Sequence, residues 1–139
     1  RVSRGLGDVY KRQFYDGDRV MLGDRIYSEY PIGRLAFAGI NLIAGSNCPT
    51  QADVSPMHGV YKASHRVSAD DVTPYRVLEM YGNNARELYG LSYDQGTIAV
   101  GMKANFVIVD KDIIHMREDL LCDVKNLATI VDGVVQWEE

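Results

Sequence analysis

The chain has 139 residues, 46% of them hydrophobic, with a formal net charge of -4 and a pI near 5.3. This length suits one ordinary domain with a real core but falls short of the roughly 250 residues of a complete (β/α)₈ barrel. The acidic balance argues against nucleic-acid binding, which needs clustered Lys and Arg, and no apolar run approaches the roughly 18 residues that cross a bilayer.

The two cysteines, Cys48 and Cys122, are too few for a disulfide-rich secreted scaffold. They also lack the C-x-x-C spacing of a zinc site. No charged-then-apolar leader opens the sequence. We therefore expect a soluble, cytoplasmic protein with no membrane partner.

The first thirteen residues, RVSRGLGDVYKRQ, carry four basic residues against one acidic residue, a net charge of +3, so the remaining chain holds -7. This composition break resembles translated adapter sequence, and we predict that residues 1–13 are a non-native segment. The alternative is a basic tail that binds an acidic partner. Residues 14–30 follow and predict a loop with one short irregular element.

A helix over residues 31–38 is predicted next, because Pro31 suits a first turn and Gly39 suits a left-handed C-terminal cap. It leads into a strand at 40–45, whose apolar run Leu42-Ile43-Ala44 is typical of a parallel strand covered on both faces. In a parallel barrel the loops after the strands form the active-site face. The polar residue two positions past the apolar run 42–45 is Asn47, which is therefore the candidate site residue.

Three helices are predicted in the middle of the chain. The first covers residues 56–66 after the capping residue Ser55, and the second starts at Pro74 after Thr73. Its buried stripe is Val77, Leu78 and Tyr81. The third ends at Gly90, and Asn84 with Glu87 three residues later is typical of the amide form of a capping box.

From Gly96 the hydrophobic period changes from helical to strand-like, with β-branched and aromatic runs at 97–100, 106–109, 128–131 and 134–137. Asp132-Gly133 between the last two runs predicts a hairpin with a type I′ turn. Helices with a parallel-type strand, followed by an antiparallel patch, indicate two structural units.

A series of short motifs follows the chain in order: YP at 30–31, AGI at 38–40, GSNCP at 45–49, GVYKA at 59–63 with Arg66, GTI at 96–98, GMKANFVIVDKD at 101–112 and TIVDGVV at 129–135. Together these motifs resemble the C-terminal third of amidohydrolases. The nearest branch is amidohydrolase family 3, which includes N-substituted formamide deformylases. The resemblance covers nearly everything after residue 28.

The resemblance implies an α/β fold, namely the last β/α units of a (β/α)₈ TIM-like barrel followed by part of a small antiparallel β-sandwich. Residues 14–95 would be the C-terminal part of the barrel, and residues 96–139 the C-terminal share of the composite sandwich. It also implies a divalent metal, zinc above all, in the intact parent. The family ligands are a His-x-His, a carboxylated Lys or acidic residue, two further His and a last-strand Asp, and of these positions the chain contains only the last.

The family pattern at that position is Gly-Ser-Asp-x-Pro, whose Asp touches the metal and acts as general base. Here the residue is Asn47, which could ligate a cation only weakly and cannot accept a proton near neutral pH. The alternatives are an inactive homologue, a metal water deprotonated by another group, or an error at one codon. Asn105 also stands where the family has Asp, and there we expect a structural role.

Plainer readings exist for each polar residue singled out. Ser46-Asn47 could form an Asx-type turn, and Cys48 is expected to be a small buried hydrophobe. No catalytic cluster is predicted from the remaining titratable residues. The histidines are expected to be surface or satisfied residues: His58, His65 and His115. The carboxylates are expected on solvated faces and in turns: Glu79, Glu87, Asp110 and Asp112.

We therefore predict a fragment of a metal-dependent hydrolase that acts on the carbon–nitrogen bond of a small-molecule amide or cyclic amide. The fragment alone should be inactive. The alternatives are a deaminase of the same superfamily, a catalytically inactive scaffold or binding homologue, and an unrelated α/β fragment. The superfamily habit of dimers and tetramers implies a homo-oligomer.

Overall fold

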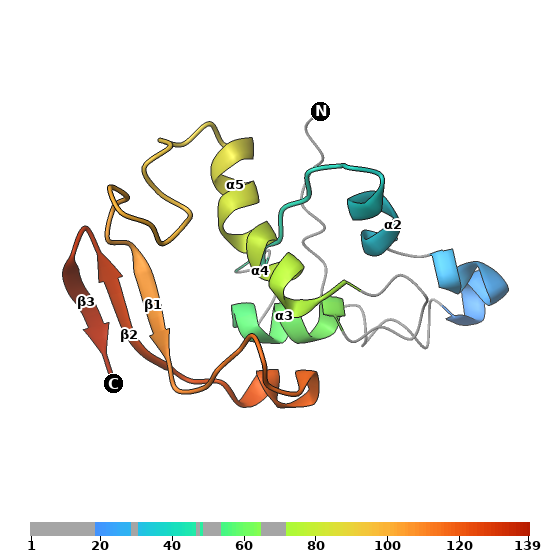
Figure 1. The fold of residues 1–139 in the computed structure, drawn as a ribbon. Helices are drawn as coiled ribbons and strands as arrows, with labels where there is room; N and C mark the ends of the chain where they lie inside the picture. The colour runs from blue at the N-terminus through green and yellow to red at the C-terminus, as the bar shows by residue number, and fades with distance from the viewer. Residues whose placement is uncertain (1–18, 29–30, 47, 49–53, 65–71) are drawn as a thin grey trace.

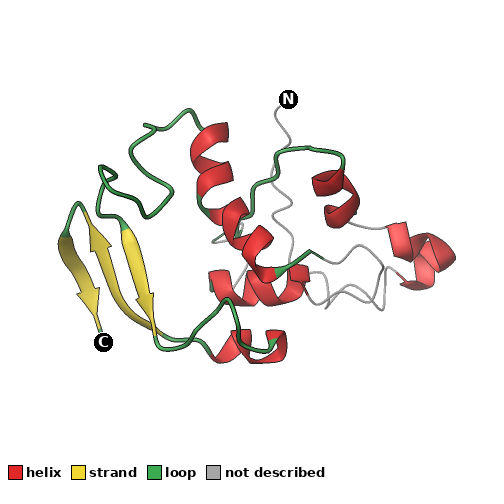
Figure 2. Cartoon of the chain, viewed as in Figure 1, coloured by secondary structure: helices red, strands yellow, loops and turns green. Residues whose placement is uncertain are grey.

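A computed structural model describes residues 19–28, 31–46, 48, 54–64 and 72–139. The predicted adapter-like segment 1–13 and the candidate Asn47 lie outside these residues. Helices occupy the middle of the chain and a small sheet its end (Figures 1 and 2). The elements are η2 (Gly23–Ser28), α2 (Ile32–Phe37), α3 (Pro56–Ser64), α4 (Pro74–Tyr81), α5 (Asn83–Leu88), β1 (Phe106–Val109), η3 (Glu118–Asp123), β2 (Asn126–Val131) and β3 (Val134–Glu138).

Helix α2 forms where the sequence predicts it. Pro31 is its N-cap, and the Pro31 carbonyl accepts a hydrogen bond from the Leu35 N–H at 2.9 Å. Gly39 follows with φ of 74°, a left-handed conformation that glycine adopts without steric cost. Both predicted ends of this helix are therefore confirmed to within one residue.

The predicted strand at residues 40–45 is wrong as a strand. Leu42 and Ile43 are buried, as expected for a covered apolar run, but residues 40–46 have no strand partner among the described residues. Their polar backbone groups bond to helices instead, and the Ala44 N–H donates to the Met80 carbonyl at 3.1 Å. A parallel strand exists only where neighbouring strands supply its ladder. The (β/α)₈ architecture therefore remains a prediction.

Helices α3 and α4 begin at their predicted prolines. The Thr73 hydroxyl accepts from the Arg76 N–H at 3.4 Å, which confirms the predicted cap of α4. The buried face of α4 is made by Val77 and Met80, with Leu78 half-buried beside them. The predicted stripe omitted Met80. Residues 65 and 66 of the predicted α3 lie outside the described part of the chain.

The predicted capping box of α5 is wrong. The N-cap of α5 is Gly82, only one residue separates α5 from α4, and Asn84 already lies inside the helix. From that position the Asn84 side chain donates to the Leu42 carbonyl, in the segment before α3, and not to the first turn of its own helix. The C-terminal end is as predicted, since Gly90 adopts φ of 63°.

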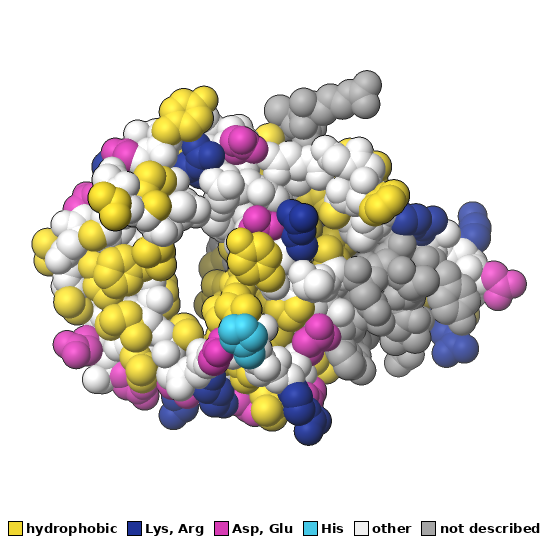
Figure 3. All heavy atoms as spheres, in the orientation of Figure 1, with side chains coloured by type: hydrophobic (Ala, Val, Ile, Leu, Met, Phe, Trp, Pro, Cys, Tyr) yellow, Lys and Arg dark blue, Asp and Glu magenta, His cyan; other side chains and the backbone are white. Residues whose placement is uncertain are grey.

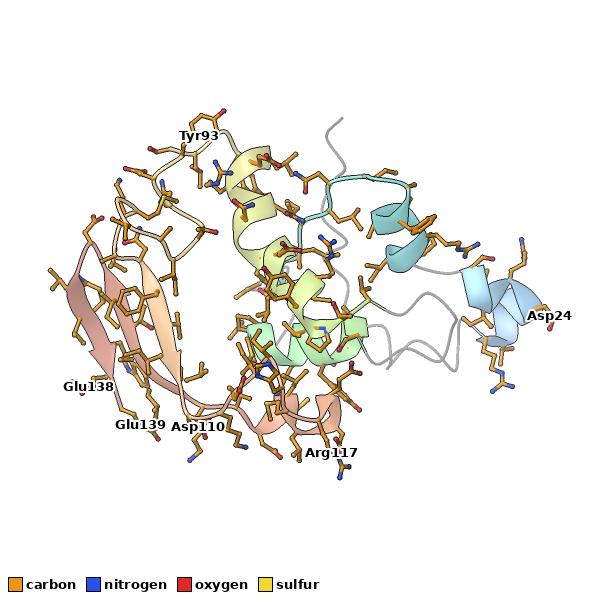
Figure 4. All side chains as sticks on the ribbon, in the orientation of Figure 1. Asp24, Tyr93, Asp110, Arg117, Glu138 and Glu139 are labelled. Carbon is orange, nitrogen blue, oxygen red and sulfur yellow. The ribbon has the colours of Figure 1, made fainter. Side chains whose placement is uncertain are left out.

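The loop after α5 is attached to that helix by Arg86. Its guanidinium lies 5.2 Å from the ring centroid of Tyr93, in cation–π range, and Figure 4 labels Tyr93 beside the end of α5. The predicted strand at 97–100 is wrong, because Gly96 and Gly101 both have positive φ and turn the chain on either side. The apolar residues between them are exposed.

Strands β1, β2 and β3 form one antiparallel sheet in that order, as predicted. The hairpin turn between β2 and β3 has φ of 49° at Asp132 and 77° at Gly133. Positive φ at both central positions is the geometry that a type I′ turn requires. The short-range hairpin signal is therefore confirmed.

The main core lies among the helices and includes one residue from the C-terminal region. Leu121 of η3 is 1% exposed and packs into the cluster, with η3 lying along α3 (Figure 1). The buried members of the cluster are Ile32, Leu42, Val60, Ala63, Val72, Val77, Met80 and Leu121. The connection between β1 and β2 therefore ties the sheet region to the helices.

Replacing Leu121 with Ala should lower the free energy of unfolding by about 2–5 kcal/mol, because the removed atoms leave a cavity in the helical core. Leu120 is the matched control, since it is 41% exposed, and Leu120→Ala should cost less than about 1 kcal/mol. Urea unfolding of the 139-residue chain measures both. Equal losses in the two variants would contradict the packing of η3 into this core.

Asn105 supports the hairpin from outside the sheet. Its Oδ1 accepts from the Asp132 N–H at 2.7 Å, and the Ala104 carbonyl accepts from the Gly133 N–H at 3.0 Å. Only an acceptor oxygen is used in the first contact, and both Asn and Asp provide one. This geometry agrees with the structural role expected for Asn105.

We therefore expect Asn105→Asp to change stability by less than about 0.5 kcal/mol, since the acceptor is kept. Asn105→Ala should destabilise the chain by about 1 kcal/mol, because the turn loses one hydrogen bond. Thermal unfolding of the two variants provides the comparison. A larger loss for Asp than for Ala would show that the amide group itself is required.

Candidate functional site

The position expected to carry chemistry, Asn47, is not among the described residues, but its flanks are. Ser46 is half-buried, and Cys48 lies in a turn and is exposed. The expectation that Cys48 is a small buried hydrophobe is therefore wrong. The chain leaves the helical core after Ile43, so a residue five positions later no longer shares that burial.

The segment before this position is held firmly by side chain and backbone contacts. Leu42 is 1% exposed, and its carbonyl accepts from the Asn84 Nδ2 at 3.0 Å. One residue earlier, the Asn41 Nδ2 donates to the Glu87 Oε2 at 2.8 Å. Helix α5 therefore anchors residues 41 and 42, a few positions before Ser46.

The described histidines do not come together. His58 on α3 is half-buried, and its Nε2–H donates to the Cys122 carbonyl at 3.3 Å, which links α3 to η3. His115 lies in an exposed turn before η3. His65 lies outside the described residues. For the two that can be seen, the expectation of satisfied or surface histidines is confirmed.

The described residues do not form a metal site. Within them, no group of three or more His, Cys, Asp or Glu side chains is arranged to hold a metal ion. A catalytic zinc needs about three protein ligands. The residues described here therefore do not fit the divalent metal that the resemblance implies, and its ligands would have to come from elsewhere.

The carboxylates singled out in the sequence make structural contacts. Glu79 pairs with Arg76 at 3.0 Å, and the Asp110 Oδ1 accepts from the Lys125 N–H at 2.8 Å. Figure 4 shows Asp110 where the chain leaves β1 toward η3. The interpretation of these groups as solvated and turn residues is confirmed.

Asp112 organises the turn that follows. Its Oδ1 accepts from the N–H groups of Ile114 and His115, and its Oδ2 lies 2.7 Å from the His115 Nδ1. The bond with the His115 side chain, aided by the backbone bond from Ile114, lowers the pKa of Asp112 below its ordinary value of 3.8. This carboxylate thus stays ionised in mildly acidic solution.

In His115→Ala, we expect the pKa of Asp112 to rise toward its ordinary value, because the strongest partner of the ionised form is gone. The pKa of Asp112 is lowered in the folded chain, so ionised Asp112 stabilises the fold at any pH above the ordinary pKa. This stabilisation is lost as the pH falls through the lowered pKa of the folded state. An NMR titration of the Asp112 carboxyl carbon measures the shift. Lys111→Ala is the control, because the Lys111 side chain bonds to the Asp123 carbonyl and not to Asp112. An unchanged pKa of Asp112 in His115→Ala would contradict the pairing of Asp112 with His115.

Within the residues described, no helix combines the length and apolar character needed to cross a bilayer.

A sequence model described as the amidohydrolase family matches residues 11–136. The chain is also 26% identical over 117 residues to the N-substituted formamide deformylase of Arthrobacter pascens, an alignment that covers 78% of this chain and 21% of that protein. The chain thus spans about one fifth of the length of this curated relative. No solved structure matches the chain significantly. The resemblance inferred from the sequence is confirmed.

Proposed function

The chain belongs to the amidohydrolase family, and from this premise we propose that it is the C-terminal part of an enzyme that hydrolyses a carbon–nitrogen bond in a small molecule. The observation that carries the proposal is the family match over residues 11–136. The relative named as a formamide deformylase points to the same bond type, since a formamide is an amide. The substrate class we favour is therefore a non-peptide or cyclic amide.

Position 47 is the part of the reacting centre that this chain would supply. In hydrolysis of an amide, a base must take a proton from the attacking water. The amide of Asn47 cannot take that proton near neutral pH, whereas the Asp that the family pattern has there can. We propose that Asn47 weakens or removes base catalysis at this position.

The chain alone is proposed to be inactive. The described residues bring no cluster of metal ligands, and the chain spans one fifth of its relative. A water activated by a divalent metal is the usual chemistry of such hydrolases, and the part of the chain that the structure describes brings together no set of ligands for such a metal. The remaining machinery would come from the rest of the parent.

The exposure of the sheet supports the proposal that residues 96–139 form a second structural unit, whose apolar surface needs another layer to cover it. All of β3 is exposed, and large apolar side chains of all three strands, among them Val107, Val131 and Trp137, are open to solvent. Apolar side chains gather over this sheet in Figure 3, and open space separates the sheet from the helices. Residues 96–139 are accordingly proposed to be one share of a β-sandwich completed by other parts of the parent.

Two other functions remain as candidates. A deaminase of the same superfamily would share the fold and differ in residues outside this chain. A catalytically inactive scaffold is favoured specifically by Asn47, which lacks the charge of the family Asp. Metal content of the parent separates the scaffold from an enzyme, because a scaffold has no requirement for a bound divalent ion.

The proposal is tested in the longer parent protein with small formamides and cyclic amides as substrates. Asn47→Asp should raise kcat by about 10²-fold or more, because a general base is restored. Asn83→Asp is the control, since it adds the same charge on α5, where the Asn83 Oδ1 accepts from the Arg86 Nε. A stoichiometric divalent metal is expected in the parent and in both variants.

The 139-residue chain, assayed with added zinc, should show no turnover above background. Turnover by the chain alone would contradict its inactivity. Absence of both metal and hydrolysis in the parent, before and after Asn47→Asp, would overturn the hydrolase proposal in favour of the scaffold. Release of ammonia from a ring amine, without amide hydrolysis, would favour the deaminase.

A further inference from the structure

Residues 41–44 are hydrogen-bonded to two helices at three positions, through one side chain and two backbone groups. The Asn41 side chain donates to Glu87, the Leu42 carbonyl accepts from Asn84, and the Ala44 N–H donates to the Met80 carbonyl, at 2.8, 3.0 and 3.1 Å. Buried backbone groups need such partners, since an unpaired one costs about as much as a lost hydrogen bond. The helices thus provide what a neighbouring strand would provide in a sheet.

The break between α4 and α5 makes this arrangement feasible. Gly82 has φ of -107° and ψ of -99°, far from helical values, so the chain changes direction after Tyr81. The Met80 carbonyl lies in the last turn of α4, where carbonyl groups lack a partner within their own helix. The Ala44 N–H fills that role.

Spacing on α5 explains the other two contacts. Asn84 and Glu87 are three residues apart and therefore lie on the same face of the helix, toward residues 41 and 42. The neighbouring residues Asn83 and Arg86 form their own bond on α5, from the Arg86 Nε to the Asn83 Oδ1 at 3.1 Å. Two asparagines adjacent in sequence therefore have different tasks.

We propose that Asn84 is a positioning residue that fixes the direction of residues 42–44, with the pair Asn41–Glu87 as a second support. Its catalytic relevance rests on the proposed function, because the fixed segment precedes position 47 by only three residues in the sequence. The contact requires a donor: a carbonyl oxygen only accepts, so the Asn84 amide must present its NH₂ group to Leu42. Asp at position 84 has the same size and cannot donate when ionised.

Asn84→Asp is therefore the sharpest variant, since it keeps the volume and removes the donor. In the 139-residue chain, the Ala44 amide should exchange with solvent about 3- to 10-fold faster, as expected for loss of one hydrogen bond in a local opening. Amides of β2 should exchange at unchanged rates. Asn83→Asp is the matched control and should leave the Ala44 amide as it was; Asn84→Ala should resemble Asn84→Asp.

Activity of the parent gives the second readout. There, Asn84→Asp in the Asn47→Asp background should lower kcat with little change in KM, because misplacing a catalytic group by about 1 Å can cost up to 10²-fold. Unchanged exchange at Ala44, or faster exchange throughout the chain, would overturn the positioning role. Faster local exchange with unchanged kcat would overturn its link to catalysis. Absence of hydrolysis in the parent and in all its variants would overturn the proposed function and, with it, the link between Asn84 and catalysis. The positioning role of Asn84 would still be decided by the exchange rate of the Ala44 amide.

Discussion

The structure depends on the requirement that a buried backbone be hydrogen-bonded wherever it runs. Leu42 is almost fully buried in the helical core, so its flanking polar groups enter the interior with it. Side chains of α5 and the last turn of α4 satisfy those groups. The packing of one apolar side chain and the bonding of its backbone thus join residues 42–44 to both α4 and α5.

The same core also receives Leu121, which links the C-terminal region to the helices. His58 adds a polar contact between α3 and η3, since it donates to the Cys122 carbonyl. The three-stranded sheet itself contributes little to that core, because most of its apolar side chains are exposed (Figure 3). Its order comes from its own ladder and from Asn105 at the hairpin turn.

Features decided by neighbours in sequence were predictable. Thr73 as a cap, the positive φ at Gly39 and the Asp132-Gly133 turn follow from local sterics and short-range hydrogen bonds. Features decided by distant partners were not. The run at 42–45 has the composition of a covered strand, yet a strand needs neighbouring strands to pair with, and the described residues include none for it. Asn84 and Glu87 have the spacing of a capping box, but their side chains bond to residues more than forty positions away.

For the candidate site too, local features were predictable from the sequence, and features that depend on distant segments were not. The sequence predicts a site at position 47 because a polar residue follows an apolar run, and Leu42 and Ile43 of that run are buried. A metal site gathers ligands from several distant segments, and among the described residues of this chain, which spans about one fifth of its relative, no such group is found. What the described residues do show is how the preceding segment is anchored, since three hydrogen bonds to α4 and α5 hold residues 41–44. Under the function proposed above, this anchoring matters because a catalytic side chain acts only when its backbone is held.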